Sequence, residues 1–140
     1  MIGYVTLGTN DLARAAKFYD AIAAEMGVGR MMDFDTFIAW GKWDGGAGIA
    51  ATKPFDGEAA SVGNGTMVAL EAKDRDQVQR LYDIALSHGG SDEGAPGPRG
   101  EPDENGMVFY AAYFRDPDGN KLNAFLMDKV ASAGRDLAPE

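Results

Sequence analysis

The feature that most constrains this chain is an internal repeat. When the 140-residue sequence is shifted by 63 positions, residues 4–27 fall on residues 67–90. A repeat of this kind indicates a supersecondary unit that occurs twice and shares a core with its copy. The identical pairs are Val5 and Val68, Leu7 and Leu70, Asp11 and Asp74, Tyr19 and Tyr82, Asp20 and Asp83, and Gly27 and Gly90.

Each copy of the repeat is predicted to begin with a strand that leads into a helix. Residues 2–7 alternate as a half-buried strand does. Asp11 is a suitable N-cap for the helix that follows, and Gly27 is a suitable residue just beyond its end. In the second copy Asp74 takes the capping position, and Gln77 stands three residues further on, as in a capping box.

Three strand-like runs follow each predicted helix. The run DPDGN at 116–120 predicts a hairpin between the last two, because Pro117 presets φ and Gly119 accepts a positive φ. Residues 93–106 have the composition of an insertion and predict a mobile loop over one edge. The six runs lie near 29–34, 36–43 and 46–53 in the first half, and near 91–99, 107–115 and 120–127 in the second.

These elements predict an α+β fold of two βαβββ repeats. Each repeat would be a four-stranded, mainly antiparallel sheet with one helix, and the bare faces of the two sheets would form a concave cleft. We expect a single domain over residues 1–128, followed by a C-terminal tail at 129–140. Within the domain, repeat one covers 1–53, a linker 54–65 and repeat two 66–128.

The composition narrows the possible partners. The formal net charge is −9, whereas binding to a nucleic-acid backbone needs clustered Lys and Arg, so no nucleic acid is expected. An acidic surface is compatible with a cationic small ligand and equally with plain solubility. The chain has no cysteine, which excludes thiolate metal sites and favours the cytoplasm. No apolar run approaches the roughly 20 residues that span a bilayer, so no membrane partner is expected.

The chain resembles the vicinal oxygen chelate superfamily, which includes glyoxalase I, bleomycin-resistance proteins and extradiol dioxygenases. The resemblance covers residues 1 to about 128. It is carried by IGYVTLGTNDLARAAKFYDAI, by the PFDG linker, by GTMVALEAKDRDQVQRLYDIALSHGGSDEGAP, and above all by AAYFRDPDGNKLNAF. It implies the fold predicted above, and it implies a homodimer.

The resemblance also implies where a metal would bind. In metal-using members the ligands come from the first strand of each repeat, usually His, and from the last strand, usually Glu. Carried over to this chain, these positions become Tyr4, Ala50, Met67 and Asn123, which are poor ligands for Zn²⁺, Ni²⁺ or Fe²⁺. The one histidine, His88, falls at the end of the second helix. We therefore expect no metal and no other cofactor.

The strand alternation predicts which side chains line the cleft. Tyr4, Thr6, Met67 and Asn123 fall on the concave side, whereas periodicity leaves open which aromatic side chains point there. A hollow lined by such side chains is typical of an organic ligand site, and also of a filled core. The predicted ligand-binding residues are Tyr4, Thr6, Met67, Asn123, Trp40, Tyr110 and Phe125.

Two side chains are candidates for acid–base chemistry without a metal. Tyr4 could donate a hydrogen bond to a substrate carbonyl, but its simpler interpretation is a buried, hydrogen-bonded tyrosine. Glu71 is the one carboxylate in step with Met67, but its simpler interpretation is a solvated residue at the end of a strand.

Three functions follow from these observations. The first is a metal-free protein of the bleomycin-resistance type that binds a small organic molecule in an aromatic-lined cleft. The second is a metal-independent lyase or isomerase that uses Tyr4 and Glu71. The third is a dimeric scaffold whose cleft is closed.

Overall fold

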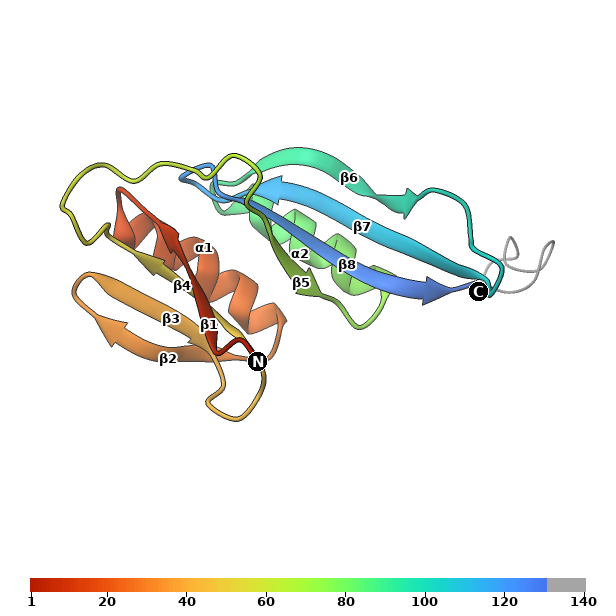
Figure 1. Cartoon of the computed structure of the whole chain (residues 1–140), viewed down its shortest axis with the longest axis horizontal. Coiled ribbons are helices and arrows are strands. Elements are labelled where there is room, and N and C mark those ends of the chain that lie inside the picture. The colour runs from red at the N-terminus through yellow and green to blue at the C-terminus, as the bar shows by residue number, and fades with distance from the viewer. Residues whose placement is uncertain (131–140) are drawn as a thin grey trace.

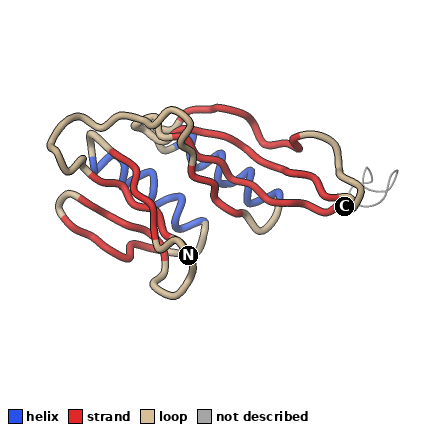
Figure 2. Tube along the Cα trace, viewed as in Figure 1, coloured by secondary structure: helices blue, strands red, loops and turns tan. Residues whose placement is uncertain are grey.

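The computed structural model describes residues 1–130 and contains the predicted repeat of βαβββ modules (Figure 1). The first module comprises β1 Tyr4–Gly8, α1 Leu12–Glu25, β2 Gly29–Phe34, β3 Phe37–Gly41 and β4 Gly48–Thr52. The second comprises β5 Val68–Glu71, α2 Arg75–Ser87, β6 Ser91–Arg99, β7 Met107–Arg115 and β8 Lys121–Lys129. Figure 2 shows one helix against each group of strands, which confirms the predicted α+β class.

Each module has a four-stranded mixed sheet with the same strand order. The order is β1-β4-β3-β2 in the first sheet and β5-β8-β7-β6 in the second. The pairs β1–β4 and β5–β8 are parallel, and the other pairs are antiparallel. The register is also the same, because Val5 pairs with Ile49 in the first sheet and Val68 pairs with Leu122 in the second. The repeat seen in the sequence is therefore a repeat of hydrogen-bond register as well.

Each sheet has one face covered by its helix, which we call the helix face, and an opposite face, which we call the open face. In β1, Leu7 is buried with the core, whereas Tyr4 and Thr6 are exposed. In β8, Leu122 and Ala124 belong to the core on the helix face. The predicted alternation of β1 and β8 is thus present, and the two open faces are the surfaces on which a ligand site was predicted.

The helices begin at the predicted caps. The Asp11 side chain accepts a hydrogen bond from the Arg14 N–H at 3.0 Å, and the Asp74 side chain accepts one from the Gln77 N–H at 2.8 Å. The Gln77 side chain accepts in turn from the N–H of Lys73, so it satisfies a donor just before the cap. These bonds satisfy amide groups that have no partner inside a helix.

The β7–β8 hairpin confirms the turn predicted from DPDGN. The Asp116 N–H donates to the Asn120 carbonyl at 2.9 Å, and Gly119 has the positive φ of +91° that the turn requires. The strand predicted near 91–99 is confirmed, and it replaces the first half of the loop predicted for residues 93–106. Residues up to Arg99 form the edge strand β6, with register shifts between Asp92 and Gly97. Glycine and proline weaken a strand pattern in sequence but are tolerated at a bulged edge.

The two modules pack through their helices. α1 contacts α2, and Phe18 of α1 lies 6.4 Å from Phe114 of β7, ring centroid to ring centroid. Residues 53–67 connect the modules between β4 and β5, and β8 extends to Lys129. The rest of the predicted tail, residues 131–140, lies outside the described part. Among the described residues, no helix is both long and apolar enough to cross a membrane.

Candidate functional site

An apolar pocket of about 450 Å³ lies between the modules. Its walls come from α1, from the adjacent ends of β1, β3 and β4, and from β5 together with Met67 just before it. β1 is an edge strand of the first sheet and β5 an edge strand of the second. The two strands do not pair, so backbone hydrogen bonds do not close the space between them. The lining includes Ile2, Val5, Ile22, Met26, Trp40, Ile49, Met67, Val68, Ala69 and Leu70.

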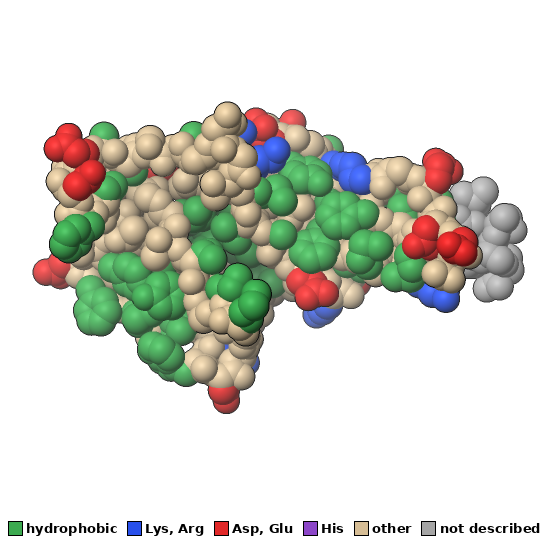
Figure 3. All heavy atoms as spheres, viewed as in Figure 1, with side chains coloured by type: hydrophobic (Ala, Val, Ile, Leu, Met, Phe, Trp, Pro, Cys, Tyr) green, Lys and Arg blue, Asp and Glu red, His purple; other side chains and the backbone are tan. Residues whose placement is uncertain are grey.

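The open face of the first sheet is uncharged and partly exposed. Tyr4 is 46% exposed, and its ring meets the Phe37 ring edge-on with 5.7 Å between centroids. The expectation of a buried, hydrogen-bonded Tyr4 is therefore wrong, because the open face has no layer above it. Thr6 lies two residues further along the same face and is exposed as well. Figure 3 shows hydrophobic side chains on the surface of this module and of the second.

The open face of the second sheet carries the other predicted residues of β8. The Phe125 ring stacks on the Phe109 ring with 5.5 Å between centroids. Asn123 stands between Ala69 of β5 and Tyr113 of β7 in the register of the sheet. It is only 1% exposed, and its Oδ1 has no hydrogen-bond partner among the described residues. A buried amide oxygen without a partner is costly, and such exceptions occur at functional sites.

Trp40 and Tyr110 lie on the helix faces, away from the open faces. Trp40 is 2% exposed, and its Nε1 donates to Asp20 Oδ1 of α1 at 2.7 Å. Tyr110 lies under the guanidinium of Arg75 from α2, at 4.5 Å from the ring centroid. Trp40 still reaches the pocket between the modules, but from the side of α1. The structure thus places these two predicted ligand-binding residues apart from Phe125 and Asn123.

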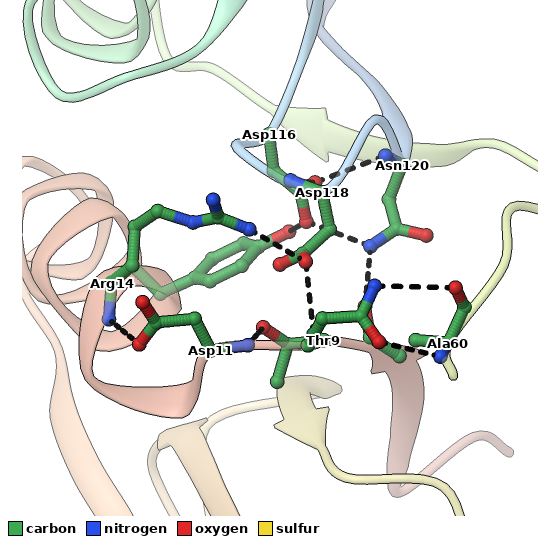
Figure 4. Close-up of polar contacts among 10 residues, drawn as sticks. Thr9, Asp11, Arg14, Ala60, Asp116, Asp118 and Asn120 are labelled. Carbon is green, nitrogen blue, oxygen red and sulfur yellow. Dashed lines mark hydrogen bonds and ion pairs between the residues drawn. The ribbon is translucent and has the colours of Figure 1, made fainter. Parts of the chain in front are cut away.

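The DPDGN turn joins the two modules through a buried carboxylate (Figure 4). Asp116 Oδ2 accepts from the Tyr19 hydroxyl at 2.7 Å and from Asn120 Nδ2 at 2.9 Å. Its Oδ1 accepts from the N–H groups of Asp118 and Asn120, each at 2.9 Å. Burial raises the pKa of the Tyr19 hydroxyl well above its usual value, and the charge of Asp116 raises it further.

The same turn reaches the loop between β1 and α1. Asp118 Oδ1 accepts from the Asn10 N–H and from Arg14 Nη2, both at 2.9 Å. Asn120 Nδ2 also donates to the Gly8 carbonyl at 2.9 Å. We call this set, residues 116–120 with residues 8–14 and Tyr19, the inter-module junction. Most of its polar groups hold the modules together, whereas Asp118 Oδ2 is buried and has no hydrogen-bond partner among the described residues.

Comparison with known proteins agrees with this architecture. The sequence pattern described as "Glyoxalase/Bleomycin resistance protein/Dioxygenase superfamily" matches residues 1–124. A glyoxalase/bleomycin resistance protein from Albidiferax ferrireducens T118 shares 32% identity at a TM-score of 0.78, over 89% of this chain and 98% of that one. The chain belongs to this superfamily.

Solved structures of lower sequence identity show the same fold. A glyoxalase-related enzyme from Fulvimarina pelagi has 20% identity and a TM-score of 0.67, over 89% of this chain and 86% of that one. The hypothetical protein SA1046 from S. aureus has 19% identity and a TM-score of 0.67, over 90% of this chain and 92% of that one. A comparison with curated proteins found no match.

The four positions that bind metal in metal-using members of the superfamily can now be placed. The shared register makes Ala50 and Asn123 equivalent, because each follows the partner of Val5 or Val68 by one residue. Tyr4 lies on the same face as Ala50, and Met67 directly precedes β5. None of the four supplies an imidazole or a carboxylate, so they do not fit a metal ion. No group of three or more His, Cys, Asp or Glu side chains within residues 1–130 could hold one.

Glu71 lies at the end of β5, opposite Phe125, and is exposed. It lines a second hollow together with Lys73 and Gln77, on the side of α2. No contact joins it to Tyr4, which lies in the other sheet. The two candidates for acid–base chemistry therefore do not form a pair in the structure.

Three residues of the second open face were not predicted as site residues. They are Arg99, Tyr113 and Lys121, and the two cations lie over the Tyr113 ring at 5.4 and 5.5 Å from its centroid. Tyr113 was one of the aromatic residues of unknown orientation, and pairing across the predicted 116–120 hairpin would have placed it opposite Asn123. Nothing in the sequence pattern marks Arg99, because its position depends on the bulged edge strand.

Proposed function

We propose that this protein binds a small organic molecule without the help of a metal ion. The observation that carries the proposal is the residue set Tyr4, Ala50, Met67 and Asn123 at the superfamily's metal positions. Zinc, nickel and iron sites are built from imidazole, thiolate and carboxylate donors, which are lacking at all four. The fold of the superfamily is kept, and the four side chains at these positions are uncharged. Uncharged side chains of this kind are suited to contact with an organic ligand.

The pocket between the modules supports binding of the apolar part of such a ligand. Its volume of about 450 Å³ is in the usual range of small-molecule sites. Met67 contributes to its lining and is 40% exposed, so it lies where the pocket meets solvent. The buried hydroxyl of Tyr19 is engaged by Asp116, and Lys42 supplies a charge in an otherwise uncharged lining.

A metal-independent lyase or isomerase is the alternative. It receives less support because Tyr4 and Glu71 stand on different sheets with no contact between them. The closed scaffold receives less support because the pocket is open. We further propose, from composition and the superfamily, a cytoplasmic homodimer with no nucleic-acid partner. Exposed apolar side chains on the open face of the first module, such as Tyr4 and Phe34, support a second copy packing there.

The test uses the uncharged fluorescent probe N-phenyl-1-naphthylamine. We expect saturable binding to the wild-type protein and, in Met67→Glu, binding weakened by about tenfold or more, because a carboxylate at the pocket mouth must be desolvated. Met127→Glu is the matched control. It is the same substitution at a residue 50% exposed that does not line this pocket, and it should leave the affinity unchanged.

Metal analysis of the purified protein tests the other half of the proposal. Zinc, nickel or iron bound in stoichiometric amount, and lost on substitution of Tyr4 or Met67, would overturn it. The enzyme alternative gains if an organic compound that binds is chemically converted by the wild type but not by Glu71→Gln or Tyr4→Phe.

A further inference from the structure

The ion pairs of this acidic chain leave out one arginine. Among residues 1–130, five arginines each form an ion pair with Asp or Glu, namely Arg14, Arg30, Arg75, Arg80 and Arg115. Arg99 is the sixth and has no carboxylate partner in that range. In a protein with 22 acidic residues against 13 basic ones, an unpaired arginine is the less expected arrangement.

The Arg99 guanidinium is nevertheless held in one place. Nη1 donates to the Gly97 carbonyl and Nη2 to the Ala95 carbonyl, both at 2.8 Å. The group lies over glycines, since a Cβ at Gly94 would meet Nη2 at 3.2 Å and a Cβ at Gly97 would meet Nη1 at 3.3 Å. A guanidinium has five N–H donors, so these two bonds leave others available. The bulged edge strand therefore presents a fixed cation that no carboxylate of residues 1–130 pairs with.

A second cation without an ion pair in residues 1–130 lies near the same ring. Arg99 comes from β6 and Lys121 from β8, and both approach the ring of Tyr113 on the strand between them. Lys121 forms no ion pair within the described residues. Glu93, a carboxylate of β6 in the same sheet, is engaged by Arg115. Figure 3 shows Lys and Arg side chains beside hydrophobic ones on this module.

Asn123 connects the two cations to the pocket. In register it neighbours Tyr113 on one side and Ala69 on the other, and Ala69 lines the pocket. Asn123 is almost completely buried, and its Oδ1 has no hydrogen-bond partner among the described residues. A donor on a ligand would satisfy this oxygen. Two strand spacings, about 10 Å, separate Ala69 from Tyr113, a distance that one organic molecule can span.

We propose that the second open face is an anion subsite for the ligand of the adjacent pocket. The subsite consists of Arg99, Lys121, Tyr113 and Asn123. Its ligand is an organic anion, a carboxylate or sulfonate on an apolar and preferably aromatic body, with the anionic group at Arg99 and Lys121 and the body towards Ala69. Arginine suits the planar geometry of a carboxylate, and lysine adds a point charge.

This inference concerns the charge of the ligand and rests on the proposed binding function. The acidic composition was compatible with a cationic ligand, whereas the cations of the second open face suit an anionic one. Local charge decides recognition at short range, because exposed charges further away than about 8–10 Å are screened by salt.

The test compares two probes with the same aromatic body. They are the uncharged N-phenyl-1-naphthylamine and its anionic relative 8-anilino-1-naphthalenesulfonate. We expect Lys121→Met and Arg99→Met each to weaken binding of the sulfonate by about tenfold, the loss of one charge-assisted contact, and to leave binding of the neutral probe within about twofold.

Lys129→Met is the matched control. Lys129 lies on the same strand and, by alternation, on the same face as Lys121, and it pairs with Met107 at the other end of β8. The substitution changes the net charge equally, so it should leave both affinities unchanged. Urea unfolding of each variant establishes that it is folded.

The outcomes separate this inference from the proposed function. If the neutral probe binds and the sulfonate is indifferent to Lys121 and Arg99, the anion subsite is overturned while the pocket stands. The subsite is also overturned if Lys121→Met weakens the affinity for both probes equally, because the effect would not depend on the sulfonate. It is overturned likewise if Lys129→Met weakens sulfonate binding as much as Lys121→Met does, because the effect would then follow net charge. If no probe binds the wild type, the proposed function fails as well.

Discussion

The helix faces of the two modules are alike, whereas their open faces differ. On the helix faces the shared register matches Val5 with Val68, Leu7 with Leu70, Ile49 with Leu122, Ala51 with Ala124 and Trp40 with Phe114, which are all apolar. On the open faces it matches Ala39 with Tyr113, Gly48 with Lys121 and Ala50 with Asn123. Packing restricts one side of each sheet, and the other side was free to become different in the two modules. The open face of the second module is therefore where a specific function is expected.

The largest expected effect is the loss of a helix-face aromatic residue. Phe114 is fully buried, so Phe114→Ala should lower the free energy of unfolding by about 3–5 kcal/mol. Phe125→Ala, a partly exposed aromatic on the open face of the neighbouring strand, should cost roughly 1 kcal/mol. Urea unfolding measures both. Equal losses would contradict the division into a packed face and an adaptable face.

The repeated tyrosines provide a second comparison. Tyr19 and Tyr82 are equivalent in sequence, but the Tyr19 hydroxyl donates to buried Asp116 and the Tyr82 hydroxyl donates to exposed Asp92. Tyr19→Phe should cost about 1.5–3 kcal/mol in unfolding free energy, because it removes a buried hydrogen bond to a carboxylate. Tyr82→Phe should change stability by less than about 0.5 kcal/mol. If the two variants had the same midpoint in urea, the inter-module junction would not be a major source of stability.

Alkaline pH should reveal the same junction. The folded protein raises the pKa of Tyr19, so the unionised phenol is favoured in the native state. The resulting stabilisation is complete below the unfolded pKa of about 10 and is lost as the pH rises towards the folded pKa. Unfolding free energies measured from pH 8 to 11 should therefore fall more steeply in the wild type than in Tyr19→Phe. Parallel curves would show that Tyr19 does not titrate differently in the folded and unfolded states.

The smallest effect is expected for a contact that only the first module has. Hydrogen bonds from Arg30 lower the pKa of Asp20, burial opposes them in part, and the Trp40 indole adds to them. A lowered folded pKa gives stability that is present above the unfolded pKa, about 3.9, and lost as the pH falls towards the folded one. Asp20→Asn should thus cost up to about 1 kcal/mol at pH 7, since the carboxylate is half exposed, and less at pH 3.

Asp83→Asn is the control for this prediction. Asp83 is the repeat partner of Asp20, and its hydrogen-bond donor is Gln79 on its own helix. Its substitution should leave the pH dependence unchanged. A cost for Asp20→Asn that is the same at pH 3 and pH 7 would assign the effect to packing and not to ionisation.

Much of the fold could be predicted because local signals agreed with one another. The repeat, the Asp11 and Asp74 caps and the DPDGN hairpin each depend on residues close in sequence. The orientation of β3 and β7 could not be predicted, because the runs FIAWG and MVFYAAYFR are apolar on both faces and have no alternation to read. The sequence therefore left the orientation of Trp40 and Tyr110 open, and the structure places both on the helix faces.

The charged part of the site was beyond sequence reasoning for a different reason. Whether an arginine has a carboxylate partner depends on side chains that are distant along the chain. Arg14, for example, pairs with Asp118, 104 residues away. No local pattern distinguishes Arg99 from such a residue. The lack of a carboxylate partner for Arg99 among residues 1–130 is seen only in the three-dimensional structure.

The inter-module junction has a consequence for how the chain acquires its structure. Its hydrogen bonds between the two modules join residues 97 to 112 positions apart, from Tyr19 with Asp116 to Gly8 with Asn120. During synthesis the first module therefore emerges long before the partners of its β1–α1 loop exist. Contacts of such long range slow folding, because loop closure must precede them. The β1–α1 loop of the first module should therefore reach its final structure only after the β7–β8 hairpin near the end of the chain has formed.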